Sequence, residues 1–155
     1  MRKYYLAYGS NLSYEQMRCR CRDNAVVGAT ILKDYRLAFK GRQNGSSYLT
    51  IEECEGSYVP VGVYQISESD ERMLDRFEGY PESYQKEYID VNLNGETINA
   101  MIYVMNKKFD YHIPTNQYVE ICRKGYKNFL FDDEILDEAL ETTKENMPKL
   151  YQKVI

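Results

Sequence analysis

The hydrophobic pattern in the first two thirds of the chain predicts a fold rich in β-strands. The run from Lys3 to Tyr8 carries few charges after its first residue, which is typical of a strand buried on both faces. β-Branched, aromatic and alternating apolar residues indicate one or two strands within residues 25–39 and one strand each within 48–51 and 59–66. The polar and glycine-containing stretches between these runs are expected to form a loop at 41–47 and a turn at 55–57.

Two further strands are expected over residues 84–93 and 96–105, because apolar side chains alternate along both. Asn94-Gly95 lies between them. This dipeptide is a strong signal for a tight β-hairpin, since both residues tolerate a positive φ. Residues 107–113, which follow the hairpin, are expected to form a loop.

Capping residues predict two helices between the strands. Ser13 and Gln16 match the capping-box pattern, so we expect a short helix over residues 14–21. Ser67 and Asp70 repeat the pattern before a second helix. The apolar residues of this second helix recur at helical spacing and predict its core-facing stripe, formed by Met73, Leu74 and Phe77.

Two more helices are expected towards the C-terminus. Residues 114–124 form one, with Gly125 as a C-cap, and residues 132–140 form the other. The tail from Thr142 onwards is polar as far as Leu150-Tyr151 and is expected to pack loosely.

The order of these elements indicates the fold class. The pattern contains about six or seven strands, and hairpin connections dominate it. We therefore expect an α/β (α+β) protein with a curved, mostly antiparallel, β-barrel-like sheet and flanking helices. The 155 residues suffice for one domain with a real core, so a single domain over residues 1–155 is predicted.

Charge and hydropathy narrow the classes of partner. The net charge of −4 argues against nucleic acid, because phosphate binding needs a basic face. No apolar run approaches the roughly 20 residues of a membrane span, and the start of the chain lacks the apolar region of a signal peptide. We therefore expect a cytoplasmic protein without a nucleic-acid or membrane partner, either a monomer or a homodimer.

The cysteines and the single histidine offer little catalytic or metal-binding chemistry. Cys19 and Cys21 are too close in sequence to share one helix face, and His112 is the chain's one histidine. A structural zinc site, a disulfide framework and a histidine-based triad are therefore poorly supported. All four thiols are expected to be reduced, namely Cys19, Cys21, Cys54 and Cys122.

The stretch from Tyr8 to Leu12 joins the first strand to the first helix. Its sequence, Tyr-Gly-Ser-Asn-Leu, predicts a tight turn, because glycine adopts positive φ without steric cost and asparagine tolerates it. Such a turn can aim successive backbone N–H groups at an anion or a developing oxyanion. An ordinary connection between a strand and a helix is the alternative interpretation.

Glu78 is a carboxylate in an unfavourable position. It lies in the last turn of its helix, where free carbonyl groups and the helix dipole disfavour negative charge. At about 100° per residue it lies at the margin of the apolar stripe, whereas Asp75 falls on the opposite face and is expected to be solvated. Partial burial would raise the pKa of Glu78 and suit it to act as a general base. An ordinary surface glutamate is the alternative.

These two segments, taken together, resemble the γ-glutamylcyclotransferases and their AIG2-like relatives. The later block that carries the resemblance is Leu74-Asp75-Arg76-Phe77-Glu78-Gly79-Tyr80-Pro81. Weaker matches occur at 35–39, 49–51, 61–66, 100–104 and 114–118. The chain departs from the family pattern at Cys19–Asp23, where Arg-Cys-Pro is often found.

The resemblance implies cleavage of a γ-glutamyl amide to 5-oxoproline and a free amine, without a metal or organic cofactor. Glu78 would be the catalytic acid/base. The substrate-binding residues implied by the resemblance are the turn, Tyr8, Gly9, Ser10, Asn11 and Leu12, and three further tyrosines, Tyr84, Tyr103 and Tyr118. The amine half could be an amino acid, a peptide, a simple amine or an aminoglycoside-like compound.

Two other functions remain open at this stage. The first is a non-catalytic protein that binds a small carboxylate-bearing ligand on the same fold. A glutamate rather than a glutamine at position 78 favours the enzyme over this alternative. The second is an interaction module that uses a tyrosine-rich surface, since the chain has sixteen tyrosines and no tryptophan.

Overall fold

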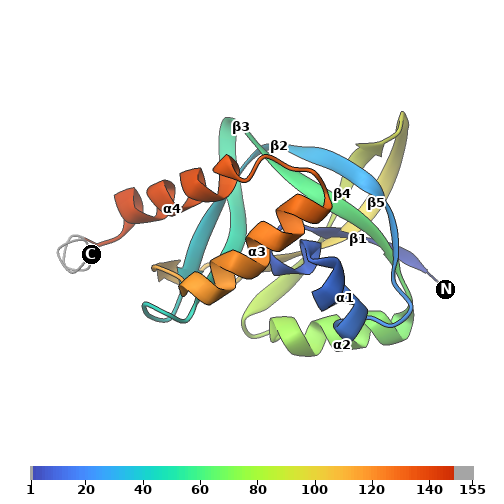
Figure 1. Ribbon diagram of the computed structural model, residues 1–155, viewed down its shortest axis with the longest axis horizontal. Helices are drawn as coiled ribbons and strands as arrows, with labels where there is room; N and C mark the ends of the chain where they lie inside the picture. Colours follow the sequence, from blue (N-terminus) through green and yellow to red (C-terminus); the bar gives the residue numbers. More distant parts are fainter. Residues whose placement is uncertain (1, 149–155) are drawn as a thin grey trace.

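A single curled sheet forms the centre of the molecule in the computed structural model, which describes residues 2–148 (Figure 1). The strand order is β4-β5-β1-β3-β2-β6. The strands are β1 (Lys3–Ala7), β2 (Ala25–Gly41), β3 (Ser47–Ile66), β4 (Tyr84–Leu93), β5 (Glu96–Met105) and β6 (Asp110–Tyr111). Every pairing is antiparallel except that of β1 with β5. The predicted curved, mostly antiparallel α+β fold is therefore confirmed.

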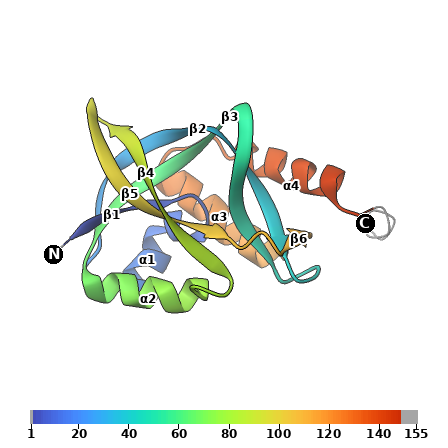
Figure 2. The same cartoon turned by 180° about the vertical axis from the view of Figure 1, so that it is seen from behind.

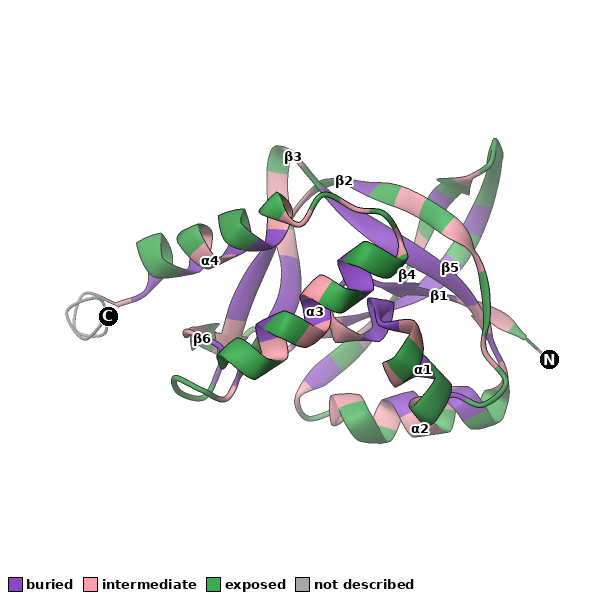
Figure 3. Ribbon diagram, viewed as in Figure 1, coloured by how far each residue is buried: buried purple, intermediate pink, exposed green. Residues whose placement is uncertain are grey.

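Helices cover the sheet and its lower edge. They are the 3-10 turn η1 (Ser10–Leu12), α1 (Tyr14–Arg20), α2 (Glu68–Glu78), α3 (Asn116–Asn128) and α4 (Glu134–Asn146). Figures 1 and 2 show α1, α3 and α4 on one face of the sheet and α2 along its lower edge. Buried residues follow the strands and the inner sides of these helices (Figure 3). The core therefore lies between the sheet and its helices.

The structure joins strands that the sequence pattern separates. Residues 25–41 form one strand, and β3 continues through the expected turn at 55–57. The register between β2 and β3 shifts where Lys33 pairs with Tyr58 and Tyr35 pairs with Glu53. Gly56 has a positive φ of 85° there and donates its N–H to the Asp34 side chain at 3.0 Å. The glycine therefore accommodates a bulge within a continuous strand rather than ending it.

Local signals predict the β4–β5 hairpin and the start of α2 well. Asn94 and Gly95 both have positive φ, as the predicted hairpin requires. Ser67 and Asp70 form both hydrogen bonds of the capping box. Gly79 adopts the left-handed conformation and ends α2.

Gly125 is not the C-cap that the sequence suggests. It lies inside α3, which runs on to Asn128, and it packs against the turn of η1. A Cβ at this position would come within 2.5 Å of the Leu12 Cβ and 2.6 Å of the Ser13 nitrogen. Glycine is therefore needed here because α3 and η1 approach each other closely. It is not needed to end a helix.

Two other corrections concern the last third of the chain. Residues 110–111 form β6 against β2, within a stretch expected to be loop. The expected loose tail begins instead as an ordered part of α4, where Thr143 is fully buried and its hydroxyl accepts a hydrogen bond from the Phe39 N–H at 2.9 Å. The apolar pair Leu150-Tyr151 lies outside the described residues.

Candidate active site

A cavity of about 490 Å³ opens between the turn after β1, the C-terminal end of α2, the β2–β3 loop and α3. It contains Glu78 and most of the residues proposed from the sequence. Those lining it are Tyr8, Gly9, Ser10, Asn11, Tyr84, Tyr103 and Tyr118. Leu12 does not line the cavity, because its side chain is fully buried in the core. The turn after β1 and the end of α2, which the sequence singled out, therefore face the same cavity.

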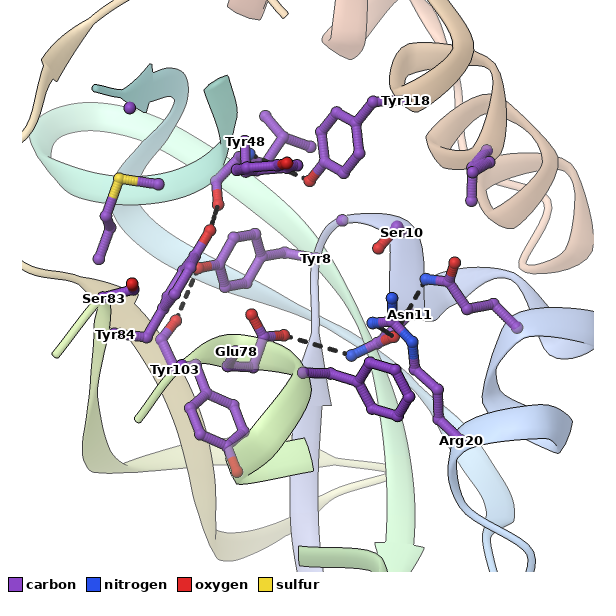
Figure 4. Close-up of a pocket in the computed structure, with 18 of the residues that line it drawn as sticks. Tyr8, Ser10, Asn11, Arg20, Tyr48, Glu78, Ser83, Tyr84, Tyr103 and Tyr118 are labelled. Carbon is purple, nitrogen blue, oxygen red and sulfur yellow. Dashed lines mark hydrogen bonds between the residues drawn. The ribbon is translucent and has the colours of Figure 1, made fainter. Parts of the chain in front are cut away.

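Asn11 is the residue that links the turn to Glu78. Its side-chain oxygen accepts hydrogen bonds from Arg20 at 3.0 Å and from Gln16 at 3.2 Å. The side-chain nitrogen consequently points the other way, to the Tyr5 hydroxyl at 2.9 Å and to Glu78 Oε1 at 3.4 Å. Asn11 is buried, so these partners hold its amide in one orientation (Figure 4).

Arg20 is the functional candidate that sequence reasoning missed. In the sequence, Arg18, Arg20 and Arg22 make the first helix locally basic, a pattern typical of a solvated face. Instead, the Arg20 guanidinium bonds to Asn11 and lies 4.3 Å from the centre of the Phe77 ring. Arg20 lies in the last turn of α1, and the packing of α1 beside α2 turns it towards the cavity. No local sequence signal distinguishes Arg20 from its exposed neighbour Arg18.

The position of Glu78 accounts for its acid–base properties. It ends α2 at the cavity wall, where withdrawal from water is the main cause that raises its pKa, to about 7. The positive charge of Arg20 opposes this shift without cancelling it. Near neutral pH both protonation states of Glu78 are populated, which is the condition for a group that accepts and returns a proton.

Phe77 and Asp75 depart from the expected faces of α2. Phe77 is 51% exposed at the cavity wall beneath Arg20, so it is not a core residue. Asp75 accepts a hydrogen bond from the Tyr103 hydroxyl at 2.6 Å and pairs with Lys86 at 2.9 Å. Asp75 is therefore not simply solvated but ties α2, and Glu78 with it, to β4 and β5.

The tyrosines of the cavity are fixed by backbone groups. The Leu49 carbonyl accepts from the Tyr84 hydroxyl at 2.8 Å, and the Leu49 N–H donates to the Tyr118 hydroxyl at 3.1 Å. The Tyr8 hydroxyl donates to the Tyr103 carbonyl at 2.6 Å. The Leu49 groups are available because β1 pairs only with residues 62–66 of β3, so β1 does not extend along the first part of that strand.

This environment keeps the tyrosine hydroxyls protonated. Burial is the main cause that raises the pKa of Tyr8, Tyr84 and Tyr118 above the ordinary value, and the negative charge of Glu78 adds to it. The three side chains therefore line the cavity as neutral hydrogen-bonding groups and do not act as proton acceptors. The Tyr103 hydroxyl points to Asp75, and the part of this residue bonded to Tyr8 is its carbonyl (Figure 4).

Other sources of chemistry are sparse in the part of the chain that the structure describes. Residues 2–148 hold no group of three or more histidine, cysteine and acidic side chains arranged to bind a metal. The four cysteines are free thiols, and burial raises the pKa of Cys21 and Cys122 to about 12. None of the helices within this range is long and apolar enough to cross a membrane.

The protein is of the mixed α+β class, with a curled six-stranded sheet and a cavity lined by the Glu78 carboxylate and a polar turn. The chain belongs to the gamma-glutamyl cyclotransferase, AIG2-like family, whose model matches residues 5–120. The predicted membership is therefore confirmed. A search of curated proteins finds no match.

Solved structures support the same fold. A protein described as a gamma-glutamyl cyclotransferase is 25% identical, with a TM-score of 0.74 and coverage of 96% of this chain and 89% of the other. An uncharacterized protein from Homo sapiens is 26% identical, with a TM-score of 0.75 and coverage of 95% and 89%. YkqA from Bacillus subtilis is 22% identical, with a TM-score of 0.73 and coverage of 92% and 54%, and supports the fold alone.

Proposed function

We propose that this protein is a γ-glutamylcyclotransferase, which converts a γ-glutamyl amide to 5-oxoproline and a free amine. The observation that carries the proposal is the placement of Glu78, a carboxylate with a pKa of about 7, in a cavity and 3.4 Å from Asn11. Family membership supports the same reaction. The cavity of about 490 Å³ is within the range of ordinary small-molecule sites.

In the proposed reaction, ionised Glu78 accepts a proton from the α-ammonium group of the substrate. The resulting amine attacks the γ-carbonyl carbon of the same molecule and closes a five-membered ring. The bond between this carbon and the leaving nitrogen then breaks, and protonated Glu78 returns a proton to that nitrogen. The ring nitrogen still carries one surplus proton, which passes to the released amine, so that this amine leaves as an ammonium ion. The substrate is divided into 5-oxoproline and an amine without any other reactant, so atoms and charge balance.

The task of the cavity in this scheme is to hold the γ-glutamyl chain bent. An intramolecular attack gains its rate from proximity, because the two reacting groups are held together. Gly9, Ser10 and Asn11 lie at the start of η1, and the first amides of a helical turn have no partner within it. In our proposal these amides bind the glutamyl carboxylate or the oxyanion that forms on the carbonyl.

Tyr84 and Tyr118 form a second part of the cavity wall in this proposal, which adjoins the turn where the Tyr118 hydroxyl lies close to Gly9. Because the Leu49 backbone holds both hydroxyls, the rings keep their places when no ligand is bound. A preformed wall restricts the bent substrate at little entropic cost. Tyr8 and Tyr103 extend the same wall beside Glu78.

The test is release of 5-oxoproline from a panel of γ-glutamyl amides by the wild-type protein and by Glu78→Gln. We expect turnover by the wild type and a loss of at least about 100-fold in kcat for the variant, as removal of a general base predicts. Glu82→Gln, which changes an exposed carboxylate nearby, is the matched control and should keep wild-type turnover.

Each outcome has a distinct meaning. Wild-type protein that binds γ-glutamyl amides but releases no 5-oxoproline would support a non-catalytic binding protein instead. Turnover by Glu78→Gln equal to that of the wild type would contradict the role of Glu78 while keeping the reaction. Circular dichroism of the variants separates loss of chemistry from loss of fold.

A further inference from the structure

The charges around the cavity are unbalanced in favour of cations. Among the described residues that line it, the side chains charged at neutral pH are three arginines, Arg20, Arg42 and Arg76, and the carboxylate of Glu78. A γ-glutamyl substrate brings one carboxylate and one ammonium group on its glutamyl half, so this half has no net charge. The net positive charge of the cavity is therefore greater than the glutamyl half alone would neutralise.

Arg42 lines the cavity from the β2–β3 loop, whereas Arg20 lines it from α1. Arg42 is the first residue of the β2–β3 loop, which lies beside β6 and the start of α3, well apart from α1 (Figure 1). In Figure 4, Asn11 and Arg20 lie on one side of Glu78, and Tyr48 and Tyr84 lie on the other. Tyr48 is the second residue of β3 and follows this loop directly. A ligand whose glutamyl half reaches Glu78 and Asn11 would extend its amine half in the direction of Arg42.

The β2–β3 loop is held in place by hydrogen bonds. The Gly45 N–H donates to the Ile113 carbonyl at 2.9 Å, and the Ile113 N–H donates to the Asn44 side chain at 3.3 Å. The His112 ring also contacts Asn44, with 3.3 Å between Nδ1 and Oδ1. These bonds anchor the loop to the segment after β6, so Arg42 starts from a fixed backbone position.

The guanidinium of Arg42 has no acidic partner within residues 2–148. It contacts the neutral ring of Phe109, with the guanidinium carbon 5.6 Å from the ring centre, and both residues line the cavity. Asp110 pairs with Gly41 across β6 and β2 and is therefore near Arg42. Its side chain accepts a hydrogen bond from the Tyr111 N–H and forms no ion pair with Arg42. A guanidinium held over an aromatic ring keeps its N–H donors free, and those donors match the two oxygens of a carboxylate.

We propose that Arg42 is a specificity residue that binds a carboxylate on the amine half of the substrate. The inference rests on the proposed function and deepens it. An arginine in this role selects γ-glutamyl amino acids or peptides over γ-glutamyl derivatives of neutral amines. Phe109 positions the guanidinium, and Ser46 and Tyr48 also line the cavity. The Lys108 amino group lies 5.2 Å from the centre of the Phe109 ring and adds to the positive field.

The test compares substrates that differ only in one charge. γ-Glutamyl-alanine and γ-glutamyl-glycylglycine are each paired with their C-terminal carboxamides, and kcat/KM for 5-oxoproline release is measured for each member. The two substrates carry one and two residues after the γ-glutamyl group, so they place the C-terminal carboxylate at two different distances from Glu78. We expect the wild type to prefer the acid over the carboxamide by about tenfold in at least one pair, mainly through KM.

Variants then assign the preference to Arg42. Arg42→Gln should reduce the ratio to less than about threefold, and Arg42→Lys should give an intermediate ratio, because lysine keeps the charge but not the two-pronged donor. Arg18→Gln removes an exposed arginine outside the cavity and should keep the wild-type ratio. Equal rates on both members of both pairs, or an unchanged ratio in Arg42→Gln, would overturn the inference.

Failure of the proposed function gives a different result. If the wild type releases no 5-oxoproline from any of the four compounds, the reaction is wrong, but their binding can still be measured by calorimetry. A preference for the acids that Arg42→Gln abolishes would then still support Arg42 as a carboxylate-binding residue. Equal affinity for acids and carboxamides would contradict it.

Discussion

The side-chain nitrogen of Asn11 lies 3.4 Å from Oε1 of Glu78, although 67 positions separate the two residues in the sequence. This contact joins the turn after β1 to the last turn of α2. The turn is fixed by Tyr64, whose hydroxyl donates to the Asn11 carbonyl at 2.8 Å. The contact therefore belongs to a rigid part of the fold, and changes on either side of it should alter the properties of the other.

The first prediction concerns the pH dependence of turnover. The pKa of Glu78 is raised to about 7, and the proposed mechanism uses its ionised form. We expect kcat/KM to fall about tenfold per pH unit below pH 7, and to level off above it until the substrate's own ammonium group titrates. The measurement is an initial-rate profile of 5-oxoproline release from pH 5 to pH 8.5. An acidic limb centred near the ordinary carboxyl pKa would contradict the assignment.

A change at Asn11 should move this profile. Asn11→Asp places a second carboxylate beside Glu78, and a like charge favours the protonated form. We expect the acidic limb of the profile to shift upwards by about one pH unit or more, whereas Asn11→Ala should lower kcat without a comparable shift. Asn146→Asp, at the exposed end of α4, is a control that should leave the limb where it is. An unshifted limb in Asn11→Asp would indicate that the two side chains do not interact in solution.

The stability of the fold should also depend on pH through Glu78. Its folded pKa of about 7 lies above its ordinary value of 4.5, so between these values the native state binds more protons than the unfolded chain. The free energy of unfolding should therefore decrease as pH rises from 4.5 through 7.

Glu78→Gln removes this titration. At pH 8 the variant should be more stable than the wild type by on the order of 1–3 kcal/mol, and at pH 4.5 the difference should nearly disappear. Urea denaturation at both pH values measures it, with Glu82→Gln as the matched control. A variant equally or less stable than the wild type at pH 8 would show that Glu78 is well solvated.

The last prediction concerns the packing that supports the turn. Gly125→Ala would place a Cβ within 2.5 Å of the Leu12 Cβ and 2.6 Å of the Ser13 nitrogen. Both neighbours belong to short, buried segments, so we expect a loss of about 1–3 kcal/mol in the free energy of unfolding. Alanine would stabilise an ordinary helix position, and Lys124→Ala, exposed in the same helix, provides that comparison. A stabilised Gly125→Ala variant would contradict the close packing of α3 on the turn.

The sequence by itself determined the elements whose signals lie within a few residues. Asn94-Gly95 specifies the β4–β5 hairpin through the backbone conformations it permits. Ser67 and Asp70 specify the start of α2, and Gly79 specifies its end. These signals are local hydrogen bonds and φ preferences, so they can be recognised without knowledge of what packs nearby. The family motifs at Tyr8–Leu12 and Leu74–Pro81 then supplied the fold and named Glu78.

Only the tertiary structure decided which residues face one another. Arg20 and Arg18 occupy similar positions in the sequence, but Arg20 lies over the Phe77 ring as well as bonding to Asn11, because α2 packs beside α1. Gly125 carries a helix-end signal, yet α3 continues past it, since packing against Leu12 outweighs that local preference. Phe77 continues an apolar stripe but lies at the cavity wall under Arg20. Each outcome depends on contacts between segments distant in sequence, and local propensities, which act over only a few residues, carry no information about such contacts.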